Sequence, residues 1–167
     1  MRTISALRGL TVWIVLVLMF VLTPVASRAA DDTILTVTGR HAQTGAEVTI
    51  DLSLAEIAAM ESSVLETTTI WTSGEIAFRG VLLQDLFRFL DLELPLRVRC
   101  TALNEYRIEI PLSDTRETTV LVAYQQDGSY MRVRDKGPLW IIYPRESGII
   151  NAADRMIWQL RHMESVY

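Results

Sequence analysis

Apolar and polar residues alternate in two segments, 35–37 and 48–52, and Gly45 lies between them. A period of two places successive side chains on opposite faces of a strand, so one face of each segment is expected to be buried. The pattern therefore predicts two strands joined by a turn near Gly45.

Helical spacing appears at two places. Ser53 and Glu56 form the Ser-x-x-Glu pattern of a capping box, which predicts that a short helix begins here. Apolar residues between Leu82 and Leu90 recur at intervals of three and four, which gives a second helix one apolar face that ends before Pro95. We expect this second helix to pack on the sheet.

The rest of the chain has the pattern of short strands. The β-branched run from Thr67 to Trp71 predicts a third strand that ends at Gly74, and after Leu96 the alternation places Cys100 on the apolar face. Further strands are expected at 106–110, 120–124, 130–133, 139–143 and 157–166, with Asp127 and Gly128 as a hairpin turn. About eight strands and two or three short helices predict an α+β fold in one domain, residues 30–167.

The first 29 residues have the order of a secretory signal peptide. Arg2 and Arg8 precede an uncharged apolar run from Gly9 to Leu22, and small residues precede a cleavage point after Ala29. The apolar run has about 14 residues, fewer than the roughly 20 that span a bilayer, so cleavage is favoured over an uncleaved anchor. We therefore expect a periplasmic or secreted protein.

The export signal also bears on partners and stability. Only Arg8 stands directly before the apolar run, so the twin-arginine pair of the folded-protein route is missing and the chain is expected to cross unfolded. Cleavage would move the formal charge from −4 to about −7, which disfavours nucleic acid and anionic lipid as partners. The lone Cys100 cannot form an internal disulfide.

Few residues in the sequence have a pattern that indicates metal binding, nucleophilic catalysis or ligand binding. Two histidines without metal-ligand spacing do not predict a metal site, and no serine has a nucleophile-elbow pattern. Cys100 on an apolar face is expected to be a small buried hydrophobe. Trp71 stands beside polar residues at the end of its predicted strand and is the best candidate for stacking on a flat ligand. Lys136 and its charged neighbours before Gly137 form either a polar rim for a ligand or a solvated strand edge.

Several motifs together resemble one known family. They are Trp71 with Gly74, the segment Phe78–Leu82, the segment Ala102–Tyr106, the segment Asp135–Pro144 with its Gly-Pro-Leu core, and Ile157–Leu160. Over nearly the whole chain after the leader, the sequence resembles the small secreted members of the sulfite-oxidase-type molybdopterin-binding domain family. The resemblance implies a fold of mixed, mainly antiparallel sheets with two or three short helices.

In the large enzymes of that family, the domain holds a pterin-dithiolene molybdenum cofactor with a protein cysteine on the metal. The resemblance implies that Cys100 is that ligand. The sequence after it differs from the Cys-Ala-Gly-Asn pattern of the enzymes, because Cys100 is followed by Thr101, Ala102, Leu103 and Asn104. Arg155 would correspond to a phosphate-binding arginine, whereas Trp158 stands where a lysine is expected. One hypothesis is therefore a molybdopterin-dependent oxidoreductase.

Small secreted relatives imply a different role, a non-catalytic pterin-binding protein that relays its ligand state to the periplasmic domain of a membrane signalling protein. The site implied for the pterin comprises Trp71, Arg79, Cys100, Asn104, Tyr106, Lys136 and Gly137, with no metal. Trp71 or Tyr106 would stack on the ring, and Asn104 would bind its edge. A third hypothesis is an interaction domain whose pocket is closed by Trp140 and Trp158. Because the chain is expected to cross unfolded and without cofactor, we favour the pterin-binding protein.

Overall fold

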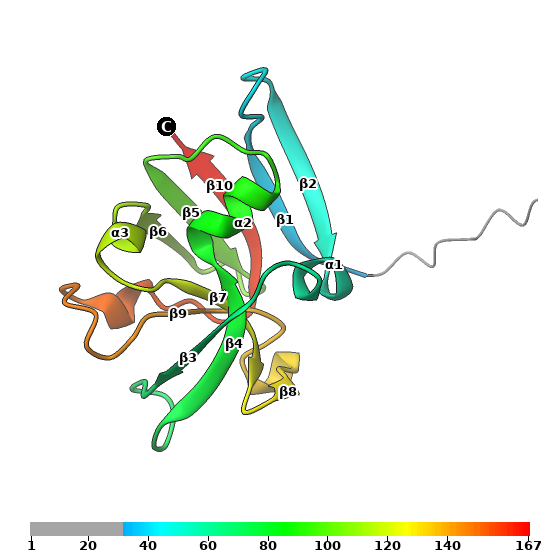
Figure 1. Ribbon diagram of the computed structural model, residues 1–167. Coiled ribbons are helices and arrows are strands. Elements are labelled where there is room, and N and C mark those ends of the chain that lie inside the picture. Colours follow the sequence, from blue (N-terminus) through cyan, green and yellow to red (C-terminus); the bar gives the residue numbers. More distant parts are fainter. Residues whose placement is uncertain (1–31) are drawn as a thin grey trace, which may run out of the picture.

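The structure is a computed structural model that describes residues 32–167 (Figure 1). The expected signal peptide, residues 1–29, and the start of the expected domain at residue 30 lie outside these described residues.

Five strands form the first sheet, in the order β2-β1-β10-β5-β6. The strands are β1 (Thr33–Arg40), β2 (Glu47–Ser53), β5 (Arg97–Ala102), β6 (Arg107–Pro111) and β10 (Leu160–Val166). β1 runs parallel to β10, and the other neighbours are antiparallel, so this sheet is mixed. The pairing of β1 with β10 places the first and last strands of the described chain side by side (Figure 1).

The second sheet is antiparallel and has the order β3-β4-β7-β8, with β9 also paired to β7. Its strands are β3 (Ser63–Thr67), β4 (Ile76–Leu82), β7 (Leu121–Gln126), β8 (Ser129–Tyr130) and β9 (Trp140–Ile142). Asp127 and Gly128 form the predicted hairpin turn between β7 and β8, both with positive φ as a two-residue turn of this kind requires.

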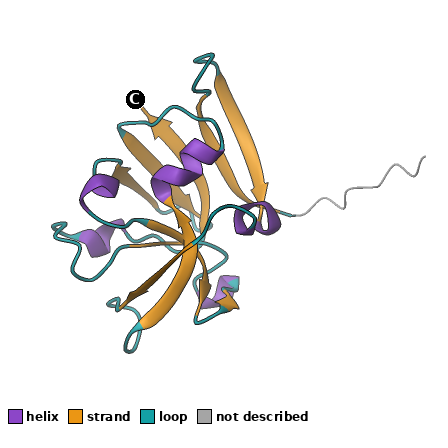
Figure 2. Ribbon diagram, in the orientation of Figure 1, coloured by secondary structure: helices purple, strands orange, loops and turns teal. Residues whose placement is uncertain are grey.

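The helices are short. They are α1 (Leu54–Ala58), α2 (Leu83–Phe89), α3 (Asp114–Glu117) and the 3₁₀ turns η1 (Val133–Asp135) and η2 (Ala152–Arg155). Helix α2 lies across the strands of the first sheet (Figure 2). The capping box predicted at α1 is confirmed, since the Glu56 backbone N–H donates to Ser53 Oγ at 3.3 Å and the Ser53 N–H donates to Glu56 Oε2 at 2.9 Å. None of the helices within residues 32–167 is long and apolar enough to span a bilayer.

The main core lies between α2 and the first sheet. Leu83, Leu86 and Phe87 are the buried side of α2, as the apolar spacing predicted, and they join a cluster that includes Val98 and Met163. A second cluster surrounds Phe78 and Trp140 in the second sheet, and Trp71 packs against both clusters. The junction of the two sheets is therefore an aromatic-rich region.

The α+β interpretation agrees with these mixed sheets and few helices, but the third strand was misplaced. The sheet strand is Ser63–Thr67, and residues 68–75 form a loop instead of the strand predicted from Thr67 to Trp71. Local hydrogen bonds compete with sheet pairing here, because the Thr69 N–H donates to Thr72 Oγ1 and the Trp71 N–H donates to Thr69 Oγ1. The described residues contain ten strands rather than about eight.

Candidate functional site

A cavity of about 340 Å³ lies where the two sheets meet, within the size range of small-molecule sites. We call it the aromatic pocket. It is lined by residues of the loop before β4, the β5–β6 turn and the segment from η2 to β10, namely Trp71, Ala102, Asn104, Tyr106, Ala153, Asp154, Met156, Ile157 and Trp158. Three of the residues predicted for a pterin site, Trp71, Asn104 and Tyr106, are thus brought together.

Two tryptophans form one wall of the aromatic pocket. The rings of Trp71 and Trp158 meet edge to face with centroids 5.1 Å apart, and Trp140 backs both at 6.1 and 6.3 Å. The side chains of Trp71 and Trp158 are half-buried, while Trp140 is fully buried and does not line the pocket. Trp71 is therefore held by its aromatic neighbours yet keeps part of its ring open to a ligand.

The β5–β6 turn forms another wall. Asn104 Oδ1 accepts the Tyr106 backbone N–H at 3.1 Å, which leaves the side-chain amide group of Asn104 as a donor toward the pocket. The Leu103 N–H donates to the Gln159 carbonyl at 2.9 Å, so the turn is tied to the segment that carries Trp158. This wall offers an exposed tyrosine ring and an amide donor.

The 3₁₀ turn η2 supplies Ala153 and Asp154, and a buried ion pair anchors it. The Arg155 guanidinium donates to Asp114 Oδ2, and the Tyr143 hydroxyl donates to the same oxygen at 2.9 Å. Burial lowers the pKa of Arg155, but the hydrogen bond and charge of Asp114 more than offset this and raise it. Burial, followed by the hydrogen bond to Asp114, raises the pKa of Tyr143. At neutral pH Arg155 is thus a guanidinium cation and Tyr143 a neutral phenol.

Asp154 differs from Asp114 in having no partner for its side chain. Its carboxylate is exposed and makes no hydrogen bond or ion pair with any residue from 32 to 167. A free carboxylate on the wall of an aromatic-lined pocket can accept two hydrogen bonds from an amino-substituted heterocycle.

The other predicted site residues lie elsewhere. Arg79, on β4, donates to Ser62 Oγ at 3.1 Å, and the Lys136 ammonium lies 5.5 Å from the centre of the Trp140 ring. Gly137 donates its N–H to the Arg132 carbonyl, and a Cβ there would come 2.2 Å from the Met131 carbonyl oxygen. The Gly-Pro segment therefore needs glycine for close chain packing, and neither it nor Lys136 lines the aromatic pocket.

Cys100 faces the core, as its place in the alternation predicted. It is fully buried on β5 between Ile108 and Met163, and burial raises the pKa of its thiol to about 12. At neutral pH the group is a neutral thiol, which is a poor nucleophile and a poor metal ligand.

These positions do not fit a cysteine-ligated molybdenum cofactor. Such a group needs a cysteine sulfur that faces the metal, whereas Cys100 is fully buried in the core and does not line the aromatic pocket. Arg155, the implied phosphate ligand, is paired with Asp114. In the part of the chain that the structure describes, no three His, Cys, Asp or Glu side chains gather as a metal site.

Asp154 and Trp158 line the aromatic pocket but were not among the residues predicted for a pterin site. Trp158 carried a signal, because it replaces the lysine expected in the family pattern. Asp154 carried none, since an isolated aspartate in a loop resembles any solvated carboxylate until the fold places it beside Trp71.

Comparison with known proteins identifies a fold but no family. No family model and no curated protein matches the chain. Among solved structures, the sulfane dehydrogenase SoxCD from Paracoccus pantotrophus matches with a TM-score of 0.60 and 12% sequence identity. The match covers 81% of this chain and 38% of the dehydrogenase chain. At this identity the match shows a distant relationship of fold.

Proposed function

We propose that this protein is a periplasmic, non-catalytic pterin-binding protein that relays its ligand state to a membrane signalling partner. The observation that carries the proposal is the aromatic pocket, where Trp71, Trp158 and Tyr106 surround a space large enough for a bicyclic ring. Flat heteroaromatic ligands bind well to such rings because stacking buries both faces.

The polar groups of the pocket suit the edge of a pterin. Its amino group and adjacent ring N–H are parallel donors, which match the two oxygens of the free Asp154 carboxylate. The Asn104 amide can donate to the ring carbonyl or a ring nitrogen. We assign stacking to Trp71 or Tyr106 and recognition of the edge to Asp154 and Asn104.

The fold shared with a sulfane dehydrogenase supports descent from an oxidoreductase domain, and the buried neutral thiol of Cys100 supports loss of catalysis. A relay further requires that the bound and free forms present different surfaces to the partner. The exposed turn with Tyr106 is the element of the pocket best placed for that difference.

The test is to purify the full-length gene product from the periplasm and analyse one sample in two ways. Mass spectrometry and fluorescence would detect bound pterin, and elemental analysis would measure molybdenum. We expect pterin without stoichiometric molybdenum, in wild type and in Cys100→Ser alike. Stoichiometric molybdenum that disappears in Cys100→Ser would contradict the proposal and establish the oxidoreductase.

A further inference from the structure

A second cavity, of about 600 Å³, lies on the outer face of the first sheet. We call it the polar cleft. Its principal lining residues are Arg99, Thr101, Glu105, Arg107, Arg161 and His162. The β5–β6 hairpin separates it from the aromatic pocket, because Ala102, Asn104 and Tyr106 line one cavity while Thr101, Glu105 and Arg107 line the other. The polar cleft is therefore a distinct place for a ligand.

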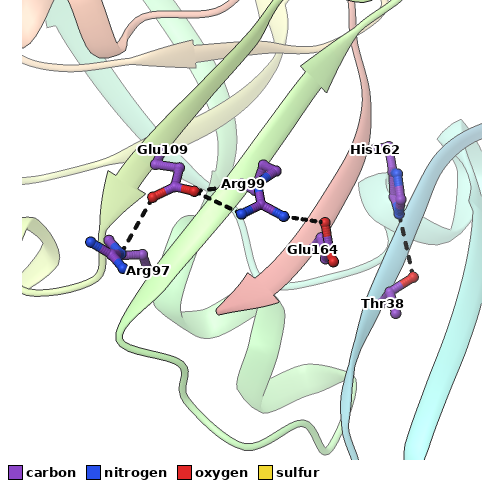
Figure 3. A network of polar contacts seen from close by, with 6 residues as sticks. All are labelled: Thr38, Arg97, Arg99, Glu109, His162 and Glu164. Carbon is purple, nitrogen blue, oxygen red and sulfur yellow. Dashed lines mark hydrogen bonds and ion pairs between the residues drawn. The ribbon is translucent and has the colours of Figure 1, made fainter. Parts of the chain in front are cut away.

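Arg99 is already paired with two carboxylates. Its guanidinium reaches Glu109 on β6 at 2.9 Å and Glu164 on β10 at 2.9 Å, as Figure 3 shows, and Arg97 adds a contact to Glu109. The hydrogen bonds that Arg99 donates to Glu109 and to Glu164 raise the pKa of Arg99. This network neutralises its own charges and frames one side of the polar cleft.

Arg107 and Arg161 are different, because they share a single carboxylate. Glu105 lies 3.4 Å from Arg107 and 3.7 Å from Arg161, and neither arginine has another ion pair within the described chain. Both contacts are long, and most guanidinium donors stay unused. Two cations facing one loosely held anion leave an excess positive charge, in a protein whose formal net charge is −4.

Two backbone irregularities place these groups. Leu160 pairs with Ala102 and His162 with Thr101, so Arg161 is the extra residue of a β-bulge that directs both Arg161 and His162 into the polar cleft. Glu105 has φ of 65°, in the left-handed region where glycine is favoured. Strained positions of this kind cluster at functional sites.

Thr101 adds a polar group to the polar cleft. The residue is 8% exposed, and its hydroxyl makes no hydrogen bond with any described residue while it lines the polar cleft. A hydroxyl without a protein partner beside two arginines can donate a hydrogen bond to an anion bound there.

We propose that the polar cleft binds a small oxyanion between Arg107 and Arg161, with the Thr101 hydroxyl donating to it and Glu105 as the internal competitor. Guanidinium pairs bind phosphate and carboxylate groups by charge-assisted hydrogen bonds. When no oxyanion is bound, the Glu105 carboxylate itself contacts Arg107 and Arg161, through long and therefore weaker ion pairs.

The test is calorimetric titration of the full-length protein with sodium phosphate and, in a second arm, sodium acetate, with sodium chloride at equal ionic strength as reference. We expect one phosphate per chain, and a weaker acetate response if the site prefers a tetrahedral anion. Arg161→Gln should weaken phosphate binding about 10-fold. Thr101→Val keeps the shape of the side chain but removes the hydroxyl, and it should weaken phosphate binding about 5-fold.

Two further variants distinguish a specific anion site from nonspecific attraction of anions to surface arginines. Glu105→Gln should strengthen phosphate binding about 3-fold, because it removes the competing charge. Arg97→Gln is the matched control, since Arg97 lies on the same sheet face but does not line the polar cleft, and it should leave binding unchanged. Heat indistinguishable from the chloride reference, or an equal loss in Arg97→Gln and Arg161→Gln, would overturn the proposal. Pterin affinity should stay the same in all four variants, so the two proposals can fail separately.

Discussion

The aromatic pocket and the polar cleft lie on opposite sides of the β5–β6 hairpin, and different kinds of side chain line them. The aromatic pocket has aromatic rings around one free carboxylate, Asp154, whereas the polar cleft has two loosely paired arginines beside the Thr101 hydroxyl. Apolar area drives binding in the first, and charge drives it in the second. The first should therefore bind flat neutral rings at any salt concentration, and the second small anions at low salt.

The aromatic pocket and the polar cleft also differ in the ion pairs that hold their walls in place. The wall of the aromatic pocket depends on the buried pair of Asp114 and Arg155, while the polar cleft depends on exposed ion pairs such as Arg99 with Glu164. A buried pair leaves an uncompensated charge when it is broken, but an exposed one is replaced by water. Mutations in the two regions should consequently differ in their effect on stability.

The largest effect is expected from Trp71→Ala in the aromatic pocket. Loss of ring stacking should weaken pterin binding about 5- to 150-fold, as judged by the roughly 1–3 kcal/mol that aromatic stacking on a base contributes. Calorimetric titration with biopterin measures the change. Ile70→Ala is the control, because Ile70 is the exposed neighbour in the same loop and does not line the pocket. Equal losses in the two variants would mean that the loop, and not the ring, binds the ligand.

Asp114→Ala tests the anchor of η2. The substitution removes the oxygen that accepts hydrogen bonds from both Arg155 and the Tyr143 hydroxyl. We expect a loss of about 2 kcal/mol in the free energy of unfolding. This is less than the cost of breaking a fully buried pair, because the Arg155 side chain is 30% exposed. Denaturant unfolding measures this loss. Glu109→Ala on the outer face should cost clearly less. If both variants lose the same amount, the proposed contrast between the two regions is wrong.

Asp154→Asn should weaken pterin binding about 5- to 10-fold, since it removes the charge from two hydrogen bonds but keeps the shape of the side chain. The same titration measures this change, and stability should not change because the Asp154 side chain has no partner among residues 32–167. Asp85→Asn, on α2, is the control with an equal change of net charge. Unaltered pterin affinity in Asp154→Asn would remove Asp154 from the site.

The smallest effect is expected from Glu105→Gly at the polar cleft. Glycine relieves the left-handed backbone at φ of 65°, so the free energy of unfolding should rise by about 0.5–1 kcal/mol, measured by denaturant unfolding. A stabilised variant would indicate that glutamate is present for its carboxylate rather than for the turn. A destabilised one would show that its contacts to Arg107 and Arg161 hold the hairpin together.

Much of the fold follows from local patterns. The alternation around Leu35 and Cys100, the capping box at Ser53 and the Asp127–Gly128 turn were all predicted, because each depends on residues close together in the sequence. The strand expected from Thr67 to Trp71 failed because threonine hydroxyls satisfy the backbone locally there.

The site was harder to predict because it depends on distant contacts. Trp71, Asn104 and Tyr106 were found from residue type and resemblance, but Asp154 and the bulge at Arg161 have no pattern of their own. Lys136 and Gly137 were predicted because their segment resembles a family motif, and in this structure Gly137 packs closely against the backbone of Met131. A motif can thus preserve a fold without preserving a contact to a ligand.

The measurement that tests the central claim most directly is titration of the ligand-free, full-length protein with biopterin, for wild type and Trp71→Ala side by side. We predict one biopterin bound per chain with quenching of tryptophan fluorescence, and at least about 5-fold weaker binding in Trp71→Ala, in line with the stacking energies above. Absence of binding to the wild type, or equal affinities in the two proteins, would contradict the account.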